Sequence, residues 1–315
     1  MDIKQLRAFI TISETKNITK AASILNIVQP AVSRQIHLLE EELGVLLFER
    51  GRHGMQITEE GKILESYARR ALKELEQAKM ELTSTDSSVL KGTVNIGIVS
   101  SLSELLSVAL MRVIKSKYPE VNLKISVGYS GHIQDWLVAG DIDLALNYEM
   151  PTSNFIDTQP IVRERLWLIG PANSNLNIKE PLEMEAMAEL PFILPYTPHR
   201  LRTVTEHVFK KQNLALQITV EVNDLNVQKQ LIKEGFGYTI LPLVSVKSDL
   251  QQGGVKAAPI NHPDFIRDIA VSLPNTRHIS KLVYTIANEI SEFSKMAVET
   301  RSWLGGEWIG NKNRK

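Results

Sequence analysis

The stretch from Asn17 to Arg50, NITKAASILNIVQPAVSRQIHLLEEELGVLLFER, has the pattern of a helix-turn-helix. Asn17 is a good N-cap, and small or apolar residues follow on one helical face, namely Ala21, Ala22 and Leu25. The pattern breaks from Asn26 to Val28, and Pro30 then suits the first turn of a second helix. The second helix carries apolar residues at amphipathic spacing, namely Val32, Ile36, Leu39 and Leu43.

The second helix of this pair predicts a surface that binds DNA. It would present Gln29, Ser33 and Arg34 outward near its N-terminus. Amide, hydroxyl and guanidinium groups in that position can bond base edges in a major groove and nearby phosphates. We therefore expect DNA contacts from these three side chains and from their neighbours Thr19, Lys20 and Pro30.

A short basic segment follows the second helix. Residues 49–58, ERGRHGMQIT, contain two glycines between residues that favour extended backbone. The segment predicts a wing of two brief arms around a turn, with Arg50 and Arg52 over phosphates or in a minor groove. The alternative is an ordinary surface loop.

The next segment has a heptad pattern. Thr58 is a plausible N-cap, and apolar or small residues then alternate at 4, 3 spacing, namely Leu64, Ala68, Ala71, Leu75, Ala78 and Leu82. A helix of roughly 25 residues would be about 37 Å long. Its narrow apolar seam needs a partner, which is either a second copy or the rest of its own chain. The polar residues 83–88 offer the seam nothing to pack on, which favours a second copy.

The N-terminal residues resemble the motif of the LysR-type transcriptional regulators. The matching positions are Leu6, Phe9, Glu14, Thr19, Ala21, Ala22, Leu25, Gln29, Pro30, Ala31, Ser33, Ile36, Leu39, Glu40, Leu43, Gly44, Leu47, Phe48 and Arg50. Asn17 replaces the family's usual serine and keeps its capping chemistry. Val28 replaces a usual Ser or Thr and cannot accept a backbone N–H. The resemblance implies a homodimer paired through the linker helix, a homotetramer built from such dimers, and contact with RNA polymerase.

From residue 91 onward the chain alternates strands and helices. Strands are predicted at 94–100, 121–130 and 142–148 with helices between them, which is a βαβαβ order and hence a parallel sheet. A second lobe is predicted from about residue 161, with strands at 191–195 and 218–224. The strand at 267–274 and the helix at 280–298 should return to the first lobe. This α/β arrangement matches the periplasmic-binding-protein-like effector domain of the LysR family.

The expected domain organisation has four parts. Residues 1–58 form a winged helix-turn-helix, and 59–90 form the linker helix and hinge. Residues 91–300 form the effector domain, with lobe I at about 91–160 and 267–300 and lobe II at about 161–266. Residues 301–315 form a tail, predicted to be frayed, although its Trp303 and Trp308 could instead dock on the protein.

Ligands of open α/β lobes bind beyond the carboxyl ends of strands, next to helix N-termini. That rule selects Ser100, Ser101, Ser103, Ser130, Gly131, Asn147 and Tyr148 from lobe I, and Pro195, Tyr196, Thr197, Asn223 and Asp224 from lobe II. The resemblance implies an inducer cleft between the lobes that uses Ser101, Ser130 and Asn223. The alternative for each Ser or Asn is a simple helix cap.

The segment 191–202, PFILPYTPHRLR, is similar to a signature in the branch that includes the nitrogen assimilation control regulators. Its matching residues are Leu194, Pro195, Pro198, His199, Leu201 and Arg202. Arg202 would either hold an anionic small-molecule effector, because a guanidinium binds a carboxylate through two hydrogen bonds, or form an ion pair between the lobes.

Composition excludes several classes of protein. There is no cysteine among the 315 residues, so disulfides and thiolate chemistry are excluded. Lysine plus arginine equals aspartate plus glutamate at 36 each, so DNA affinity must come from local arrangement. The histidines lack metal-ligand spacing, so neither a metal nor another cofactor is expected.

The sequence disfavours two function classes other than a regulator. An enzyme is disfavoured because GxGxxG, Walker, GxSxG and HExxH motifs are missing. A solute-binding protein is disfavoured because Met1 leads directly into a polar amphipathic helix without a signal peptide, and no run is long enough for a membrane span. We therefore expect a cytoplasmic regulator. The sequence does not identify the effector, and a regulator that needs none stays an alternative.

Overall fold

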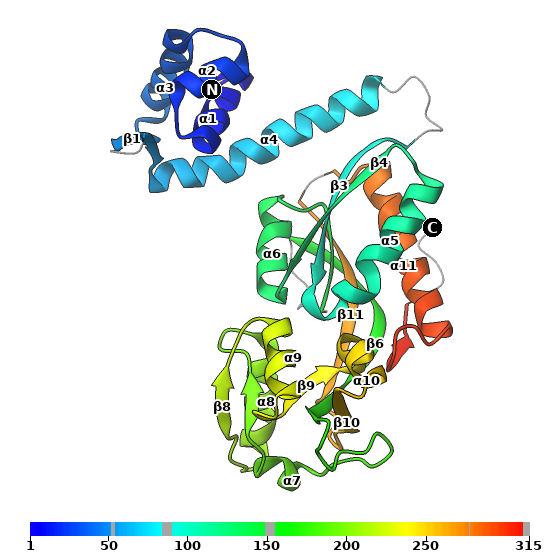
Figure 1. Ribbon diagram of the computed structural model, residues 1–315. Coiled ribbons are helices and arrows are strands. Elements are labelled where there is room, and N and C mark those ends of the chain that lie inside the picture. Colours follow the sequence, from blue (N-terminus) through cyan, green and yellow to red (C-terminus); the bar gives the residue numbers. More distant parts are fainter. Residues whose placement is uncertain (52–53, 84–89, 149–154, 277, 311–315) are drawn as a thin grey trace. The chain divides into compact units, whose positions relative to one another are not determined.

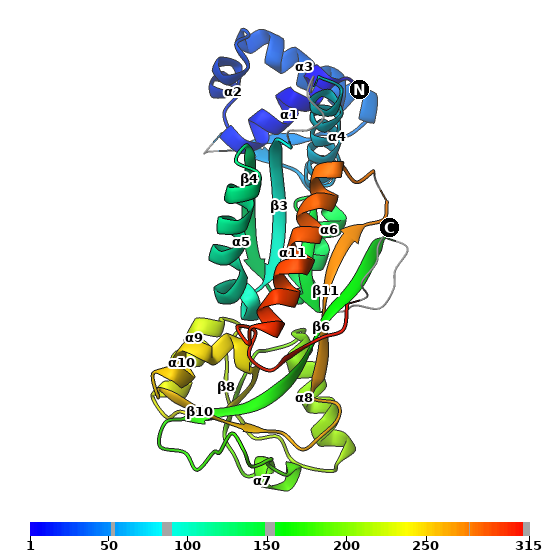
Figure 2. The ribbon, with the colours of Figure 1, turned by 90° about the vertical axis from the view of Figure 1, so that its right-hand side faces the viewer.

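The computed structural model describes residues 1–51, 54–83, 90–148, 155–276 and 278–310. The chain divides into two compact units: Met1–Ser88, and Val89–Lys315 without the short segment Ala139–Asp141, which is grouped with the first. Figures 1 and 2 show a small helical unit with a long helix, and an α/β unit of two lobes. The predicted fold class is confirmed.

The first unit begins with three helices, α1 (Ile3–Thr15), α2 (Ile18–Leu25) and α3 (Gln29–Leu43). Asp2 and Gln5 form a capping box at α1, and the Asn17 side chain accepts the Lys20 N–H at α2, as expected. The helices bury a shared core that includes Phe9, Ile12, Ala21, Ala22, Val32 and Leu39. The prediction was wrong for Leu43, which is 40% exposed because α3 ends there and Gly44 turns the chain away in the left-handed region.

The basic segment after α3 forms a hairpin of β1 (Phe48–Gly51) and β2 (Gly54–Ile57), so the wing is confirmed over the loop. The Glu40 carboxylate accepts the N–H groups of Leu47 and Phe48 and so fixes the entry to β1. Gly54 has a φ of +106°, and a Cβ there would lie 2.3 Å from the carbonyl oxygen of Lys16. Only glycine therefore lets the hairpin dock against the end of α1.

Helix α4 (Glu59–Thr83) contains the predicted heptad seam. Thr58 is its N-cap, because its hydroxyl accepts the Gly61 N–H at 3.0 Å. The N-terminal part of the seam packs on its own unit, where Ala68 is buried and Leu64 half-buried against the helix core. Arg69 supports this contact through ion pairs to Glu14 and Glu65.

Lobe I of the second unit is a sheet covered by helices on both faces. Strands β3 (Gly92–Val99), β4 (Val121–Gly128) and β5 (Leu144–Tyr148) are parallel, with β3 in the middle. Figure 1 shows α5 (Ser103–Lys117) and α11 (Lys281–Glu299) on one face and α6 (Ser130–Ala139) on the other. These elements match the predicted βαβαβ order and the predicted returning helix, which Ser280 caps.

Two long antiparallel strands, β6 (Ile156–Pro171) and β11 (Ile266–Pro274), run from lobe I into lobe II. They join β9 (Thr239–Pro242) and β10 (Val255–Pro259) in one sheet. Strands β7 (Phe192–Leu194) and β8 (Ile218–Glu221) form a separate parallel pair beside α8 (Arg200–Lys211) and α9 (Leu225–Lys233). The sequence prediction missed β10 and the five-residue helices α7 (Met184–Ala188) and α10 (Lys247–Gln251).

The expectation of a frayed tail was wrong for residues 301–310. Strand β12 (Gly306–Trp308) pairs with β6, and Trp303 is only 1% exposed in the core of lobe I. Apolar burial and an added strand together hold this segment. The rest of the predicted tail, residues 311–315, lies outside the described residues.

No helix within the described residues is both long and apolar enough to cross a bilayer.

Candidate functional site

The N-terminus of α3 is an exposed polar surface in the first unit. Gln29 and Arg34 are exposed, and the Gln29 amide donates to the Ser33 hydroxyl at 3.3 Å. Among the described residues Arg34 has no ion-pair partner, so its guanidinium is available to an anion. Val28 is the N-cap, is 70% exposed and makes no capping hydrogen bond, as the sequence predicts.

The other predicted DNA contacts lie around this surface. Thr19 and Lys20 are exposed on the first turn of α2, and Pro30 is exposed in the first turn of α3. Arg52 and the side chain of Arg50 lie outside the described residues. A helix with an uncapped N-terminus, an amide and a free guanidinium can bind base edges and phosphates.

The C-terminal part of α4 exposes the remainder of the seam. Ala71 and Ala78 are exposed, Leu75 is 48% exposed and Leu82 is 86% exposed. Ile63 and Tyr67 add further exposed apolar surface near the start of the helix. The helix therefore carries apolar side chains that its own unit does not cover.

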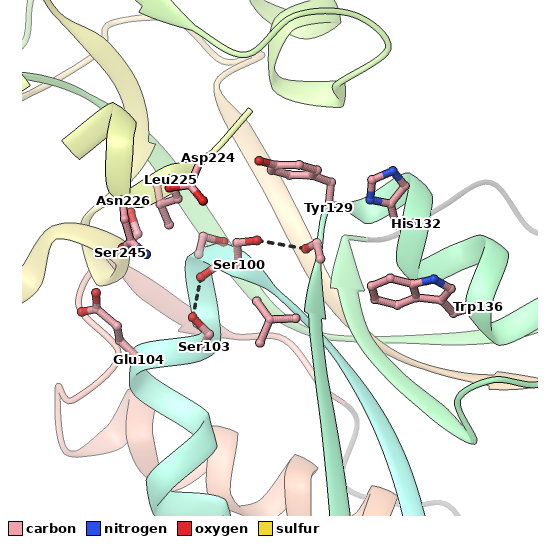
Figure 3. A pocket seen from close by; sticks show the side chains of 13 residues that line it. Ser100, Ser103, Glu104, Tyr129, His132, Trp136, Asp224, Leu225, Asn226 and Ser245 are labelled. Carbon is pink, nitrogen blue, oxygen red and sulfur yellow. Dashed lines mark hydrogen bonds between the residues drawn. The ribbon is translucent and has the colours of Figure 1, made fainter. Parts of the chain in front are cut away.

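The second unit contains a cleft where the two lobes meet, with a larger outer cavity of about 540 Å³. Figure 3 shows its arrangement: Tyr129, His132 and Trp136 form one wall, and Asp224, Asn226, Ser245 and Glu104 lie opposite, with Ser100 and Ser103 between them. The Ser100 hydroxyl donates to the Gly128 carbonyl at 3.1 Å, and the Ser103 hydroxyl donates to the Ser100 carbonyl at 2.9 Å.

A smaller cavity of about 40 Å³ lies deeper and shares Ser100, Ser101 and Tyr129 with the first. Arg267 forms its inner end, where the guanidinium lies 4.1 Å from the ring centroid of Tyr148. The same guanidinium donates to Ser101 Oγ at 3.1 Å and pairs with the buried Glu164 carboxylate at 2.7 Å. Burial alone would lower the pKa of Arg267, but Tyr148 and Glu164 hold that pKa above its ordinary value.

His199 closes the lobe II side of the deep cavity. Its Nδ1 accepts the Leu201 N–H at the start of α8, and its ring lies 5.0 Å from that of Tyr129. Burial, together with the positive charge of Arg267, lowers the pKa of His199 to about 4. The imidazole is therefore neutral at pH 7.

A network of charges ties the lobes together beside the outer cavity. Lys229 of α9 binds Glu104 of α5 at 2.9 Å and Asp249 of α10 at 2.8 Å, and Lys233 also binds Asp249. Burial would lower the pKa of Lys229, but Asp249 and Glu104 raise it above the ordinary value. An ion pair between the lobes therefore exists, but it uses Lys229 and not Arg202.

Five of the predicted effector residues line one or both of these cavities, namely Ser100, Ser101, Tyr148, Pro195 and Asn223. Asp224 and Ser103, selected by the same rule, line the outer one.

The other predicted residues, Thr197 among them, line neither cavity. Asn147 is fully buried and donates to the carbonyl of Ser130, the first residue of α6, which Gly131 follows. The Tyr196 N–H donates to Asn223, and the Tyr196 side chain is exposed. Arg202 binds Glu206 and Glu221, both in lobe II, so its charge is already matched.

Sequence reasoning missed the aromatic wall and Arg267. The rule that selected candidates considers only the carboxyl ends of strands, whereas His132 and Trp136 lie one turn apart on α6. Arg267 lies near the start of β11, and it reaches the cleft because that strand is antiparallel to its neighbours. The one available signal was the i, i+4 spacing of His132 and Trp136 after Tyr129.

Comparison with known proteins matches both units. Residues 3–62 match the family model described as "Bacterial regulatory helix-turn-helix protein, lysR family", and residues 87–294 match the model described as "LysR substrate binding domain". The chain is 29% identical to the nitrogen assimilation regulatory protein nac of Klebsiella aerogenes over 79% of this chain and 80% of that protein. It is 30% identical to the transcriptional dual regulator GltC of Bacillus subtilis over 93% of this chain and 96% of that protein.

A solved structure supports the fold. Full-length CbnR complexed with its target DNA is 20% identical and has a TM-score of 0.69 over 93% of this chain and 100% of that one. The family models cover most of the chain, and the related proteins are named as regulators and not as enzymes. The chain therefore belongs to the LysR family of transcriptional regulators, with a helix-turn-helix DNA-binding domain followed by a two-lobed effector-binding domain.

Proposed function

We propose that two copies of this regulator pair through α4 and that a small molecule in the interlobe cleft alters how the pair binds DNA. The observation that carries the cleft assignment is the convergence of Ser100, Ser101, Tyr148 and Asn223 on connected cavities. These residues come from both lobes, so a bound molecule would change the free energy of the closed arrangement relative to an open one.

The exposed part of the α4 seam supports the pairing. Leu75 and Leu82 expose large apolar side chains at heptad spacing, and a parallel or antiparallel copy of the same helix would cover them. Two paired α3 surfaces would read two half-sites, because one recognition helix with a single free arginine offers few DNA contacts. The CbnR structure, solved with its target DNA, supports DNA as the partner, and we propose double-stranded DNA. We extend the proposal to tetramers built from two such pairs, to contact with RNA polymerase and to a cytoplasmic location.

The sequence suggested an anionic effector on the strength of Arg202. That residue is matched by Glu206 and Glu221 and lines neither cavity, so it gives no support for an anion. The cleft assignment does not depend on it.

Equilibrium dialysis against a bacterial extract, followed by mass spectrometry of the retained small molecules, tests the cleft. The comparison is between the full chain and Ser100→Trp, in which an indole would fill the junction of the two cavities. We expect a compound that the full chain retains and Ser100→Trp loses, while DNA binding by Ser100→Trp persists. Equal retention by both proteins would place the effector elsewhere.

A further inference from the structure

The outer cavity has an unusual distribution of charge. The charged side chains in its lining are the carboxylates Glu104 and Asp224, and its described lining contains no lysine or arginine. Its other polar groups are serine hydroxyls, the Asn226 amide, the Tyr129 hydroxyl and the His132 ring. An anion in this cavity would lie beside negative charge with no cation in the wall to offset it.

The two carboxylates differ in how far they are already neutralised. Glu104 is bound by Lys229, within the network that also contains Asp249 and Lys233. Asp224 uses one carboxylate oxygen to cap α9, where it accepts the Val227 N–H at 2.9 Å. No ion pair of Asp224 occurs in the described part of the chain, so its charge is offset by the N-terminus of α9 but not by a lysine or arginine.

The wall opposite Asp224 is aromatic. The Tyr129 and His132 rings lie 5.8 Å apart, and the His132 and Trp136 rings 6.1 Å apart, so the three form a continuous row (Figure 3). A Cβ at Gly128 would lie 2.8 Å from the Trp136 ring, so glycine leaves the room that the indole occupies. The faces of Trp and Tyr rings attract cations, most strongly where water is excluded.

The positive charges of Arg267 and Lys229, at and beside the two cavities, are already matched. The Arg267 guanidinium is paired with Glu164, and Lys229 with Glu104 and Asp249. His199 is neutral at pH 7 because its pKa is lowered to about 4. The two cavities therefore offer a bound molecule one carboxylate that has no ion pair among the described residues, and an aromatic face.

We propose that the effector of this regulator is an organic cation, a small molecule with an ammonium group held between the Asp224 carboxylate and the Tyr129–Trp136 wall. The hydroxyls of Ser100, Ser103 and Ser245 would bind polar groups on the rest of the molecule. This inference rests on the proposed function, because it takes the cleft to be the effector site.

Titration calorimetry of the full chain with three four-carbon probes of similar size tests the charge: butylammonium, 1-butanol and butyrate. We expect butylammonium to bind most tightly and butyrate most weakly. Added salt should weaken the binding of butylammonium only. Tighter binding of butyrate or 1-butanol, or no binding by any of the three, would overturn the cation proposal.

Variants then locate the binding site. Asp224→Asn removes the charge and keeps an N-cap acceptor, so α9 should stay intact while butylammonium affinity falls about tenfold. Asp135→Asn is the matched control, since Asp135 is exposed on α6 and does not line the cavity. Trp136→Leu should also lower the affinity for butylammonium. It should remove any quenching of tryptophan fluorescence that the bound probe causes. Equal affinities for Asp224→Asn and Asp135→Asn would contradict the proposal.

The Ser100→Trp variant separates the two claims. Suppose that 1-butanol or butyrate binds the unaltered chain more tightly than butylammonium does, and that Ser100→Trp abolishes this binding. The cleft is then the effector site, and only the proposed charge is wrong. If butylammonium binds Ser100→Trp as tightly as it binds the unaltered chain, the cleft assignment itself is wrong.

Discussion

The indole Nε1 of Trp303 donates a 2.6 Å hydrogen bond to the carboxylate of Glu164, although the two residues lie 139 positions apart. The other oxygen of that carboxylate binds Arg267, which forms the inner end of the cleft. Glu164 is 1% exposed, so both partners are needed to offset its desolvation. The C-terminal segment thus completes the support of a residue that lines the interlobe cleft.

Trp303→Phe should destabilise the effector unit by about 1 to 3 kcal/mol, because it leaves a buried carboxylate oxygen without its donor. Denaturant unfolding of the full chain, followed by circular dichroism, measures the loss. Trp308→Phe is the control, since Trp308 is only partly buried and has no comparable bond to a buried acid among the described residues. Similar losses in the two variants would show that the bond to Glu164 adds nothing beyond packing.

Stability should depend on His199 below neutral pH. Its pKa is about 4 in the folded protein and ordinarily 6.5, so the unfolded chain binds the proton first as the pH falls. This contribution to the free energy of unfolding is present in full above pH 6.5 and is lost between pH 6.5 and 4. The loss is at most about 3 kcal/mol, and it is smaller than that because the ring is only half-buried. His199→Asn keeps a capping acceptor, so its stability should fall less steeply over this range. Parallel pH profiles would contradict the lowered pKa.

Val28→Ser should stabilise the DNA-binding unit by about 1 kcal/mol. Val28 occupies the N-cap of α3 with extended backbone and makes no capping bond, whereas a serine hydroxyl there can accept an N–H of the first turn. Thermal unfolding of the full chain measures the gain in the first unit. Val28→Ala is the control, because it measures the change in stability from losing the valine side chain alone. If Val28→Ser were no more stable than Val28→Ala, the capping argument would be wrong.

Arg34→Ala should reduce the free energy of binding to a specific duplex by about 1 to 3 kcal/mol and relax the sequence preference of the protein. The reason is that Arg34 is exposed near the N-terminus of α3 and has no ion pair among the described residues. Lys20→Ala should instead weaken all duplexes alike and reduce the salt dependence by about one unit of slope. Fluorescence anisotropy over a range of salt concentrations distinguishes the two. Unchanged site preference in Arg34→Ala would mean that another surface reads the bases.

Local patterns in the sequence predicted most of the fold. The helix-turn-helix, the wing and the parallel βαβαβ order follow from spacing, capping and turn residues that act over a few positions. The prediction of the tail failed because Trp303 is held by Glu164, and nothing near either residue in the sequence encodes that pairing. Leu43 fitted the helical period, but the left-handed turn at Gly44 leaves it exposed.

The candidate cleft was predicted only in part, for a topological reason. Ser100, Ser101 and Asn223 follow strands directly, so a rule on strand ends finds them. Arg267 reaches the cleft from an antiparallel strand, and Trp136 from a helix face, which depend on tertiary packing. The i, i+4 spacing of Arg202 and Glu206 was a sequence signal that Arg202 is paired, whereas its second partner, Glu221 on β8, depends on tertiary packing.

Selection of duplex DNA from a random pool, by the full chain and by Leu75→Glu/Leu82→Glu, tests most directly the claim that paired copies read DNA. Both leucines are exposed on α4, so the double substitution should leave the helical unit folded while it breaks the seam. If α4 pairs two copies, the full chain enriches a repeat of two half-sites and the variant enriches at most one. The same two-half-site repeat enriched by both proteins, or a single half-site enriched by the full chain, would contradict this pairing.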